Sequence, residues 1–246
     1  FRSLATVREP VRGAADHITD TADAPRLWDV ARFLWTQPSF RWVALGCSLS
    51  AFGGYANLYF VPKFLIVSHH LTPIQVGVLL SLLTGVLGAI GTFLSGVIAD
   101  RMGKRDVRWY MYVPILSVLI AVPFGPVFFM SPPPVLTLCA AMMPSLMGAT
   151  YLGPSYAMAQ GMVPLRMRAQ TVGILLFILN MIALGLGPAT IGYLSVLLKP
   201  AFGDDSLRYA LMAGIVTSLL STLCYLRATR TLKADLARGS FSGPKS

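Results

Sequence analysis

The sequence has few charged residues: only 12% of its 246 residues are Asp, Glu, Lys or Arg. That is about half the share found in an ordinary soluble domain. Apolar residues make up 55% of the chain, which excludes a disordered chain, a collagen-like chain and most soluble enzymes. The apolar residues form long runs with the charges between them, a pattern typical of membrane proteins.

Acidic residues are scarcer than basic ones, with 10 Asp and Glu against 20 Lys and Arg, so the net charge is +10. In a soluble protein such a charge would suggest nucleic-acid binding. Here the basic residues gather between apolar runs, as they do on the cytoplasmic side of membrane proteins. We therefore expect no nucleic-acid partner.

Histidine and cysteine are rare and poorly placed for metal binding. Cys47, Cys139 and Cys224 lie inside apolar runs, without metal-ligand spacing or a disulfide framework. His69 and His70 are adjacent, with no carboxylate or thiolate nearby, and predict a solvated loop. We expect no metal and no cofactor. A membrane enzyme is the weakest reading, because the apolar runs carry no acid, base or metal cluster.

Six apolar runs are long enough to span a bilayer, which takes about 20 residues per helix. None contains Asp, Glu, Lys or Arg: 42–61, 74–99, 109–130, 135–163, 171–198 and 209–226. Prolines within them are tolerated where neighbouring helices satisfy the freed carbonyl groups. The sequence therefore predicts an all-α membrane protein in which six transmembrane helices form one bundle over residues 42–226.

The basic residues predict the orientation of these helices. Of the 20 Lys and Arg, 17 lie before the first run, after the last run, or between the second and third and the fourth and fifth. The other connections hold only Lys63, Lys199 and Arg208. Positive charge marks the cytoplasmic side. We therefore expect a multi-pass protein of the plasma membrane with a cytoplasmic linker at 1–41 and a cytoplasmic tail at 227–246.

The linker contains a segment with its own pattern. After Pro25 comes a broad apolar stripe with polar neighbours, followed by Pro38: Leu27, Trp28, Ala31, Phe33, Leu34 and Trp35. This pattern predicts a short interfacial helix on the cytoplasmic face, with a plain helical linker as the alternative. Because the chain begins at Phe1 without a signal peptide, we expect it to be a piece of a longer sequence.

The connection between the second and third runs carries a specific motif. It reads glycine, three residues, Asp-Arg, any residue, glycine and two basic residues: Gly96, Asp100, Arg101, Gly103, Lys104 and Arg105. In sequence and position it resembles the loop signature of the major facilitator superfamily. Four further segments are similar to that superfamily and closest to its Spinster-like branch: 9–13, 153–169, 185–195 and 202–210.

The resemblance implies that the chain is the second half of a twelve-helix major facilitator fold. Its partner would be the missing N-terminal six-helix half, against which the family rocks in alternating access. In the family this loop stabilises one access state by contacting the opposite bundle, which would give Asp100 and its basic neighbours the role of a conformational latch. The alternative is a basic loop that only sets topology.

Polar residues inside the runs are candidates for the substrate cavity. They are Ser48, Tyr55, Asn57, Tyr59, Tyr156, Gln160 and Asn180. On a helix Ser48, Tyr55 and Tyr59 share a face, and Asn57 lies on the other side unless Gly53 and Gly54 break the helix. The resemblance places the helices of the first, fourth and fifth runs, which carry these residues, around the central cavity. The alternative for each residue is a hydrogen bond between helices.

The leading hypothesis is a secondary transporter for a small organic solute, amphipathic or lipid-like as the Spinster resemblance implies. The alternatives are an organic-anion or sugar-acid transporter, which arginines in the cavity would favour, and a non-transporting membrane scaffold or accessory subunit. The six runs contain no titratable acid, base or histidine. Any group that couples transport to protons is therefore expected in the missing half.

Overall fold

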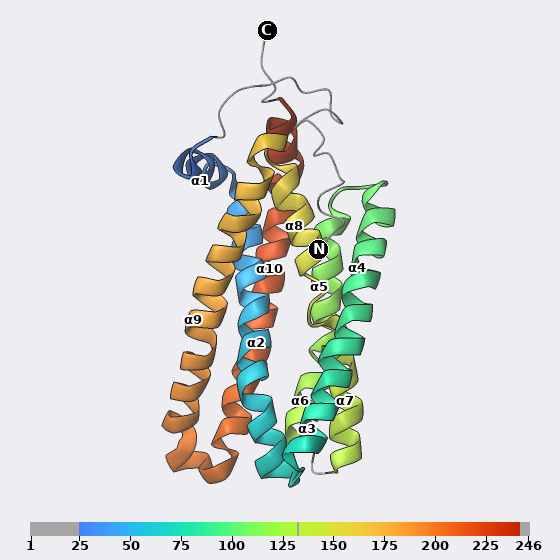
Figure 1. The fold of residues 1–246 in the computed structure, drawn as a ribbon, viewed down its shortest axis with the longest axis vertical. Coiled ribbons are helices and arrows are strands. Elements are labelled where there is room, and N and C mark those ends of the chain that lie inside the picture. The colour runs from blue at the N-terminus through green and yellow to red at the C-terminus, as the bar shows by residue number, and fades with distance from the viewer. Residues whose placement is uncertain (1–24, 132, 242–246) are drawn as a thin grey trace, which may run out of the picture.

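The structure, a computed structural model, describes residues 25–131 and 133–241 (Figure 1). Within these residues every element is a helix and none is a strand. The first part of the predicted linker, including the 9–13 segment, and the last five residues of the predicted tail lie outside the described residues. The all-helical fold class is therefore confirmed for the part of the chain that is described.

The chain enters the bundle through two helices. Helix α1 (Leu27–Trp35) lies across the bundle axis, and Gln170 on α9 donates a 2.8 Å hydrogen bond to the Pro25 carbonyl just before it. Helix α2 (Pro38–His69) begins at Pro38, which suits a first turn because its missing N–H has no partner there anyway. Helix α2 continues through Gly53 and Gly54, so Asn57 stays on the opposite side of an unbroken helix.

The next two runs form interrupted helices. Helix α3 (Pro73–Leu80) starts with a capping box between Thr72 and Gln75, and continues through the π-helix η2 (Ser81–Leu87) into α4 (Gly88–Gly103). Helices α5 (Trp109–Ala121) and α6 (Phe124–Met130) follow. They are separated at Val122 and Pro123, because proline cannot donate the backbone hydrogen bond that would continue α5.

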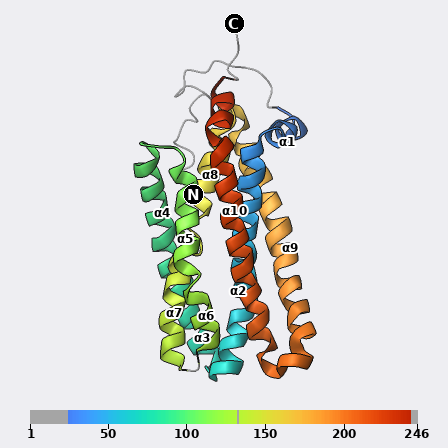
Figure 2. The ribbon, with the colours of Figure 1, turned by 180° about the vertical axis from the view of Figure 1, so that it is seen from behind.

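The last runs form one interrupted and two long helices. Helices α7 (Pro134–Met147) and α8 (Leu152–Gly161) are separated by a turn, and the 3-10 helix η3 (Leu165–Met167) leads into α9 (Arg168–Phe202). The 3-10 helix η4 (Gly203–Asp205) connects α9 to α10 (Ser206–Phe241). Helix α10 thus continues through most of the predicted tail and runs the length of the bundle (Figure 2).

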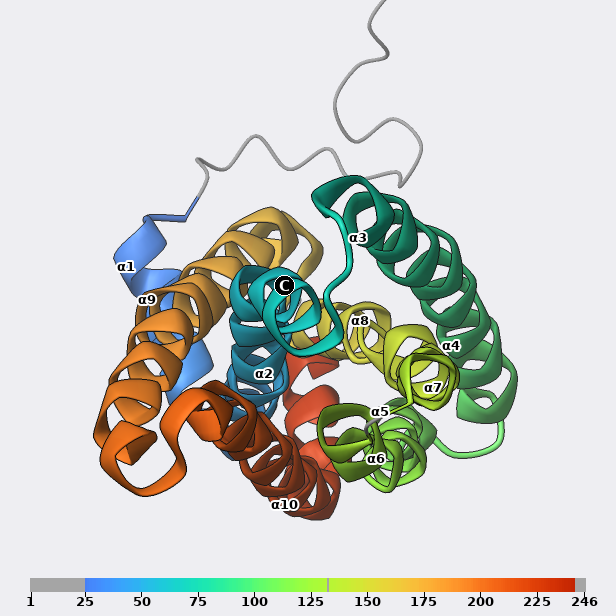
Figure 3. The same cartoon turned by 90° about the horizontal axis from the view of Figure 1, so that it is seen from below.

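The helices form one elongated bundle. Helix α2 packs against α9 and α10, while α3 to α7 form the other side (Figure 3). Close approach between α4 and α7 depends on Gly91, because a Cβ there would overlap the carbonyl group of Leu146. Two large apolar clusters fill the two ends of the bundle, one around Tyr225 and Phe40 and the other around Phe64 and Leu211.

Four described segments are long and apolar enough to cross a membrane: Pro73–Gly103, Trp109–Met130, Val135–Gly161 and Leu165–Arg238. The last has 74 residues and contains α9 and most of α10. Helix α2 is not among the four, because its serines, glycines, tyrosines and Asn57 dilute its apolar residues. The prediction of six separate membrane-spanning helices is therefore confirmed only in part.

The bundle segregates its basic residues by end. Helix α1, the α4–α5 turn, η3 and the C-terminal part of α10 lie at one end (Figure 1). Lys63, Lys199 and Arg208 lie towards the other end, around η4. The uneven distribution along the sequence thus becomes an uneven distribution in space.

Candidate functional site

The end of α4 and the turn after it carry the sequence motif. Asp100 is exposed and accepts a 2.8 Å hydrogen bond from the hydroxyl group of Tyr110 in α5. A Cβ at Gly103 would overlap the Tyr110 ring, so this glycine allows the ring to reach Asp100. A Cβ at Gly96 would have nothing within 4 Å. Gly103 therefore serves a contact within the chain, whereas Gly96 faces open space in the described part.

The three basic side chains of the motif are not neutralised by the described part of the bundle. Arg101, Lys104 and Arg105 are exposed, and none forms an ion pair with a described residue. Asp100 likewise takes its hydrogen bond from a tyrosine rather than from arginine. The motif therefore presents one carboxylate and three cations at a single end of the bundle.

A second carboxylate, which the sequence analysis did not select, ties this turn to α10. Asp106 accepts a 3.0 Å hydrogen bond from the Arg108 N–H and forms a 3.3 Å ion pair with Lys233. The Arg108 N–H holds the pKa of Asp106 below its usual value; desolvation opposes this shift, and the nearby Lys233 adds to it. Asp106 therefore stays ionised at neutral pH and fixes the turn against the long last helix.

Two of the predicted cavity residues meet across two helices. The Tyr55 hydroxyl group on α2 donates a 2.9 Å hydrogen bond to Asn180 Oδ1 on α9, and the Asn180 amide donates to the Leu176 carbonyl on its own helix. Both side chains are half-buried. This bond is a hydrogen bond between helices, as the alternative interpretation of these residues predicts. Both side chains are also partly exposed, so a ligand can still reach the pair.

The other candidates are scattered. Ser48 is fully buried and donates to the Ala44 carbonyl on its own helix at 2.7 Å. Asn57 and Tyr59 are exposed on α2, whereas Tyr156 and Gln160 are half-buried on α8. Their roles in a substrate cavity stay predictions.

Sequence reasoning missed a buried polar seam along α10. The Tyr225 hydroxyl group is fully buried and lies 3.0 Å from Ser155 Oγ on α8, while Ser50 on α2 donates to Ser221 at 3.0 Å. The sequence signal was weak, because Tyr225 and Ser221 lie in an apolar run and no local pattern shows which helices their hydroxyl groups meet. These bonds fix the positions of α2 and α8 relative to α10.

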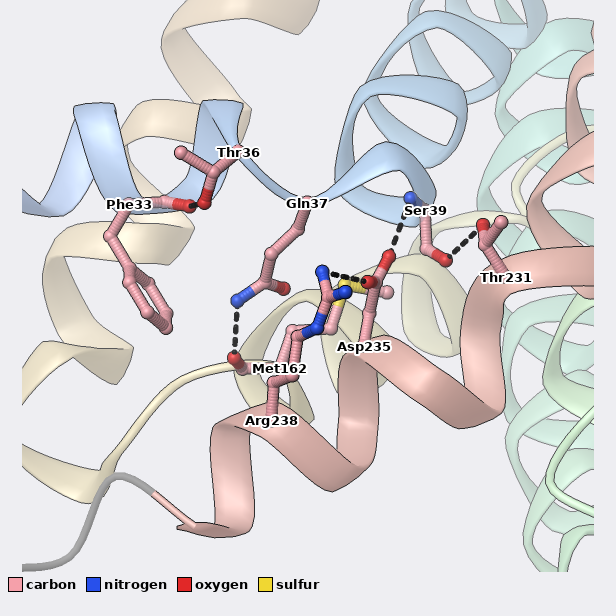
Figure 4. A network of polar contacts seen from close by, with 8 residues as sticks. All are labelled: Phe33, Thr36, Gln37, Ser39, Met162, Thr231, Asp235 and Arg238. Atoms are coloured by element: carbon pink, nitrogen blue, oxygen red, sulfur yellow. Dashed lines mark hydrogen bonds and ion pairs between the residues drawn. The ribbon is translucent and has the colours of Figure 1, made fainter.

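A third network joins the α1–α2 junction to α8 and α10 (Figure 4). Asp235 on α10 is buried and accepts a 2.8 Å hydrogen bond from the Ser39 N–H in the first turn of α2. Ser39 Oγ lies 2.7 Å from the Thr231 hydroxyl oxygen, and Gln37 donates to the Met162 carbonyl at 3.0 Å. Asp235 thus caps the start of α2 from another helix, where the helix dipole favours negative charge.

Replacing this cap should destabilise the protein. Asp235→Ala removes the acceptor of the Ser39 N–H and should lower the unfolding free energy of the complete protein by about 1–2 kcal/mol. Arg238→Ala is the matched control: its side chain is 66% exposed and 3.5 Å from Asp235, so its loss should change stability by less than about 0.5 kcal/mol. Equal losses in denaturant unfolding of the two variants would contradict the capping role.

Two cavities of the described chain lie away from the predicted substrate residues. One, of about 440 Å³, is lined by apolar residues of α6, α9 and α10, and the other, of about 260 Å³, lies around η4. Neither contains any of the seven cavity candidates. No cluster of His, Cys, Asp or Glu in the described residues could hold a metal ion.

Two comparisons of the sequence with known proteins point to the same family. A sequence model of the Major Facilitator Superfamily matches residues 4–188 and, in a second alignment, 43–241. An "MFS-type efflux pump" from Mycolicibacterium smegmatis (strain ATCC 700084 / mc(2)155) is 29% identical over 231 residues, which are 94% of this chain and 52% of that protein.

Solved structures of "a bacterial homolog to human lysosomal transporter, Spinster" are similar in fold. The inward-facing and occupied conformation gives a TM-score of 0.71 at 25% identity, covering 81% of this chain and 50% of that one. The inward-facing and unoccupied conformation gives 0.78 at 24% identity, covering 94% and 56%. The chain thus spans about half the length of the relatives it matches.

Proposed function

The chain belongs to the Major Facilitator Superfamily, and from that premise we propose that it forms the second six-helix bundle of a twelve-helix alternating-access transporter. The family and the named relatives are membrane transporters rather than enzymes. The chain is accordingly an integral membrane protein of a transporter family. Its half-length coverage and its loop motif support the assignment to one bundle, with the other six-helix half as its partner.

In this proposal all six helical stretches cross the plasma membrane, α2 included. Helix α2 has 32 residues, enough for a span, and its polar residues are expected to face the partner bundle rather than lipid. The end of the bundle with α1 and the α4–α5 turn lies in the cytoplasm, together with both termini, because it holds most of the basic residues. Exposed Trp28 and Trp35 on α1 suit the membrane interface.

Cysteine labelling should support this topology. In a complete protein whose native cysteines are replaced, Lys104→Cys should react with a membrane-impermeant thiol reagent only from the cytoplasmic side. Lys199→Cys should react only from outside, because it is exposed in the last turn of α9, and α9 ends at the opposite end of the bundle from α1. Labelling of Lys104→Cys in intact cells would invert the proposed orientation.

We propose an amphipathic or lipid-like organic solute as the substrate. The Tyr55–Asn180 pair carries this proposal, because it places a hydroxyl group and an amide beside an apolar cluster that contains Phe52 and Leu179. Such a site can orient a polar group while apolar side chains cover the rest of the ligand. The six predicted runs offer no cation to bind an organic anion.

Transport by the complete protein in proteoliposomes tests the substrate class. Ethidium and a fluorescent lysophospholipid serve as amphipathic probes, gluconate serves as a sugar acid, and protein-free liposomes serve as the control. Saturable movement of an amphipathic probe, weakened about tenfold in affinity by Asn180→Ala, is the expected result. Saturable movement of gluconate alone would favour the organic-anion alternative instead.

A further inference from the structure

The cavity around η4 brings together side chains that are far apart in the sequence. Lys63 comes from the C-terminal part of α2, Lys199 from the end of α9, and Arg208 from the start of α10. These are the three basic residues that the sequence places apart from the other seventeen. We name this cavity of about 260 Å³ the η4 pocket; its polar lining also includes Ser68, Ser195, Ser206 and Asp204.

The cations of the η4 pocket are only partly neutralised. Arg208 forms a 3.5 Å ion pair with Asp205, and both lysines are exposed, without an ion pair to any described residue. Counting Asp204 and Asp205 against the three basic residues leaves the site net positive. A pocket that holds more cations than carboxylates attracts anions.

The pocket also offers unused hydrogen-bond donors. The Arg208 Nε is buried and has no hydrogen-bond partner among the described residues, while its guanidinium carbon lies 5.7 Å from the centre of the Phe64 ring. The ring holds the guanidinium in place by a cation–π contact. The Ser206 N–H at the start of α10 is already donated to the Gly203 carbonyl, so the free donors of the pocket are on side chains. The C-terminal ends of α2 and α9 oppose an anion, but Lys199 lies in the last turn of α9 and His69 in the last turn of α2.

We infer that the η4 pocket binds a phosphate group, either as free phosphate or in the headgroup of an anionic lipid. Three cations on three helices and three serine hydroxyl groups supply the charge and the donors that a phosphate accepts. Val67 and Val196 line the same pocket and are 51% and 71% exposed, which places apolar surface beside the cations for the chains of a lipid. This site is separate from the Tyr55–Asn180 pair and goes beyond the proposed transport function.

Binding to the complete protein tests this inference without any transport measurement. In neutral detergent at constant ionic strength, inorganic phosphate should raise the melting temperature in a saturable way. In phosphatidylcholine nanodiscs, added phosphatidylglycerol should do the same if the source of the phosphate is a lipid headgroup. Response to phosphate identifies a free-anion site, and response to phosphatidylglycerol alone identifies a lipid site.

Arg208→Gln should weaken binding of whichever probe gives a response, phosphate or phosphatidylglycerol, about tenfold. Lys199→Gln gives a second variant that should fold normally, because this lysine is exposed, and it should weaken binding in the same direction. Arg230→Gln is the matched control, since it removes the same charge from an exposed position on the same helix, near the other end, and should leave binding unchanged. Absence of any response to both probes, or equal weakening by Arg230→Gln, would overturn the inference.

Discussion

Asp100→Asn is expected to lower transport by the complete protein about tenfold or more, while its abundance in the membrane stays unchanged. The change keeps the shape of the side chain and its acceptor for the Tyr110 hydroxyl group, but removes the charge. The basic residues of the motif, Arg101, Lys104 and Arg105, do not use that charge within the described chain. Its partner is therefore expected in the other bundle, and coupling of this kind typically changes an equilibrium 5- to 150-fold.

Tyr110→Phe separates this role from a local one. It removes the 2.8 Å hydrogen bond to Asp100 but leaves the carboxylate charged. If Asp100 acts on the opposite bundle, Tyr110→Phe should retain most of the transport that Asp100→Asn loses. Equal losses in the two variants would show that Asp100 only positions α5. Full transport by Asp100→Asn would show that the motif only sets the topology.

Gly91→Ala is expected to have the largest effect on folding. The added methyl group would overlap the Leu146 carbonyl group, which is backbone and cannot rotate away, so α4 and α7 would have to separate. Overpacking of this kind costs about 1–3 kcal/mol or more. A strongly lowered melting temperature and reduced yield of the complete protein in detergent are the expected results.

Gly85→Ala is the control within the same span. A Cβ there has no atom within 4 Å, so the change should leave stability unchanged or raise it slightly, because alanine is the better helix former. Equal stability of the Gly91 and Gly85 variants would show that α4 and α7 are not in close contact.

Much of the fold could be predicted because run length and net hydropathy dictate helices in an apolar chain. The breaks between helices were harder. Pro123 ends α5, yet Pro62 and Pro188 lie inside continuous helices, because neighbouring helices decide whether a proline interrupts. The helical tail was missed as well: Ala228, Leu232 and Asp235 are buried at helical spacing, but polar residues between them hide the pattern.

The candidate site could be predicted less completely than the fold. The Asp100 motif is a continuous stretch, so sequence alone locates it, and Tyr55 and Asn180 were selected as polar residues in apolar runs. Their hydrogen bond to each other depends on the rotation of α2 and α9, which no local pattern determines. The convergence of Lys63, Lys199 and Arg208 likewise depends on how three helix ends meet.

If this bundle alternates access to a cavity shared with a partner bundle, thiol accessibility at Asn57 reveals the alternation without knowledge of the substrate. Asn57 is exposed near the middle of α2. In the complete protein, otherwise free of cysteine, Asn57→Cys should react with an impermeant thiol reagent from either side of the membrane, and Asp100→Asn should shift the ratio of the two rates. Reaction from one side only, or from neither, would contradict alternating access at this site.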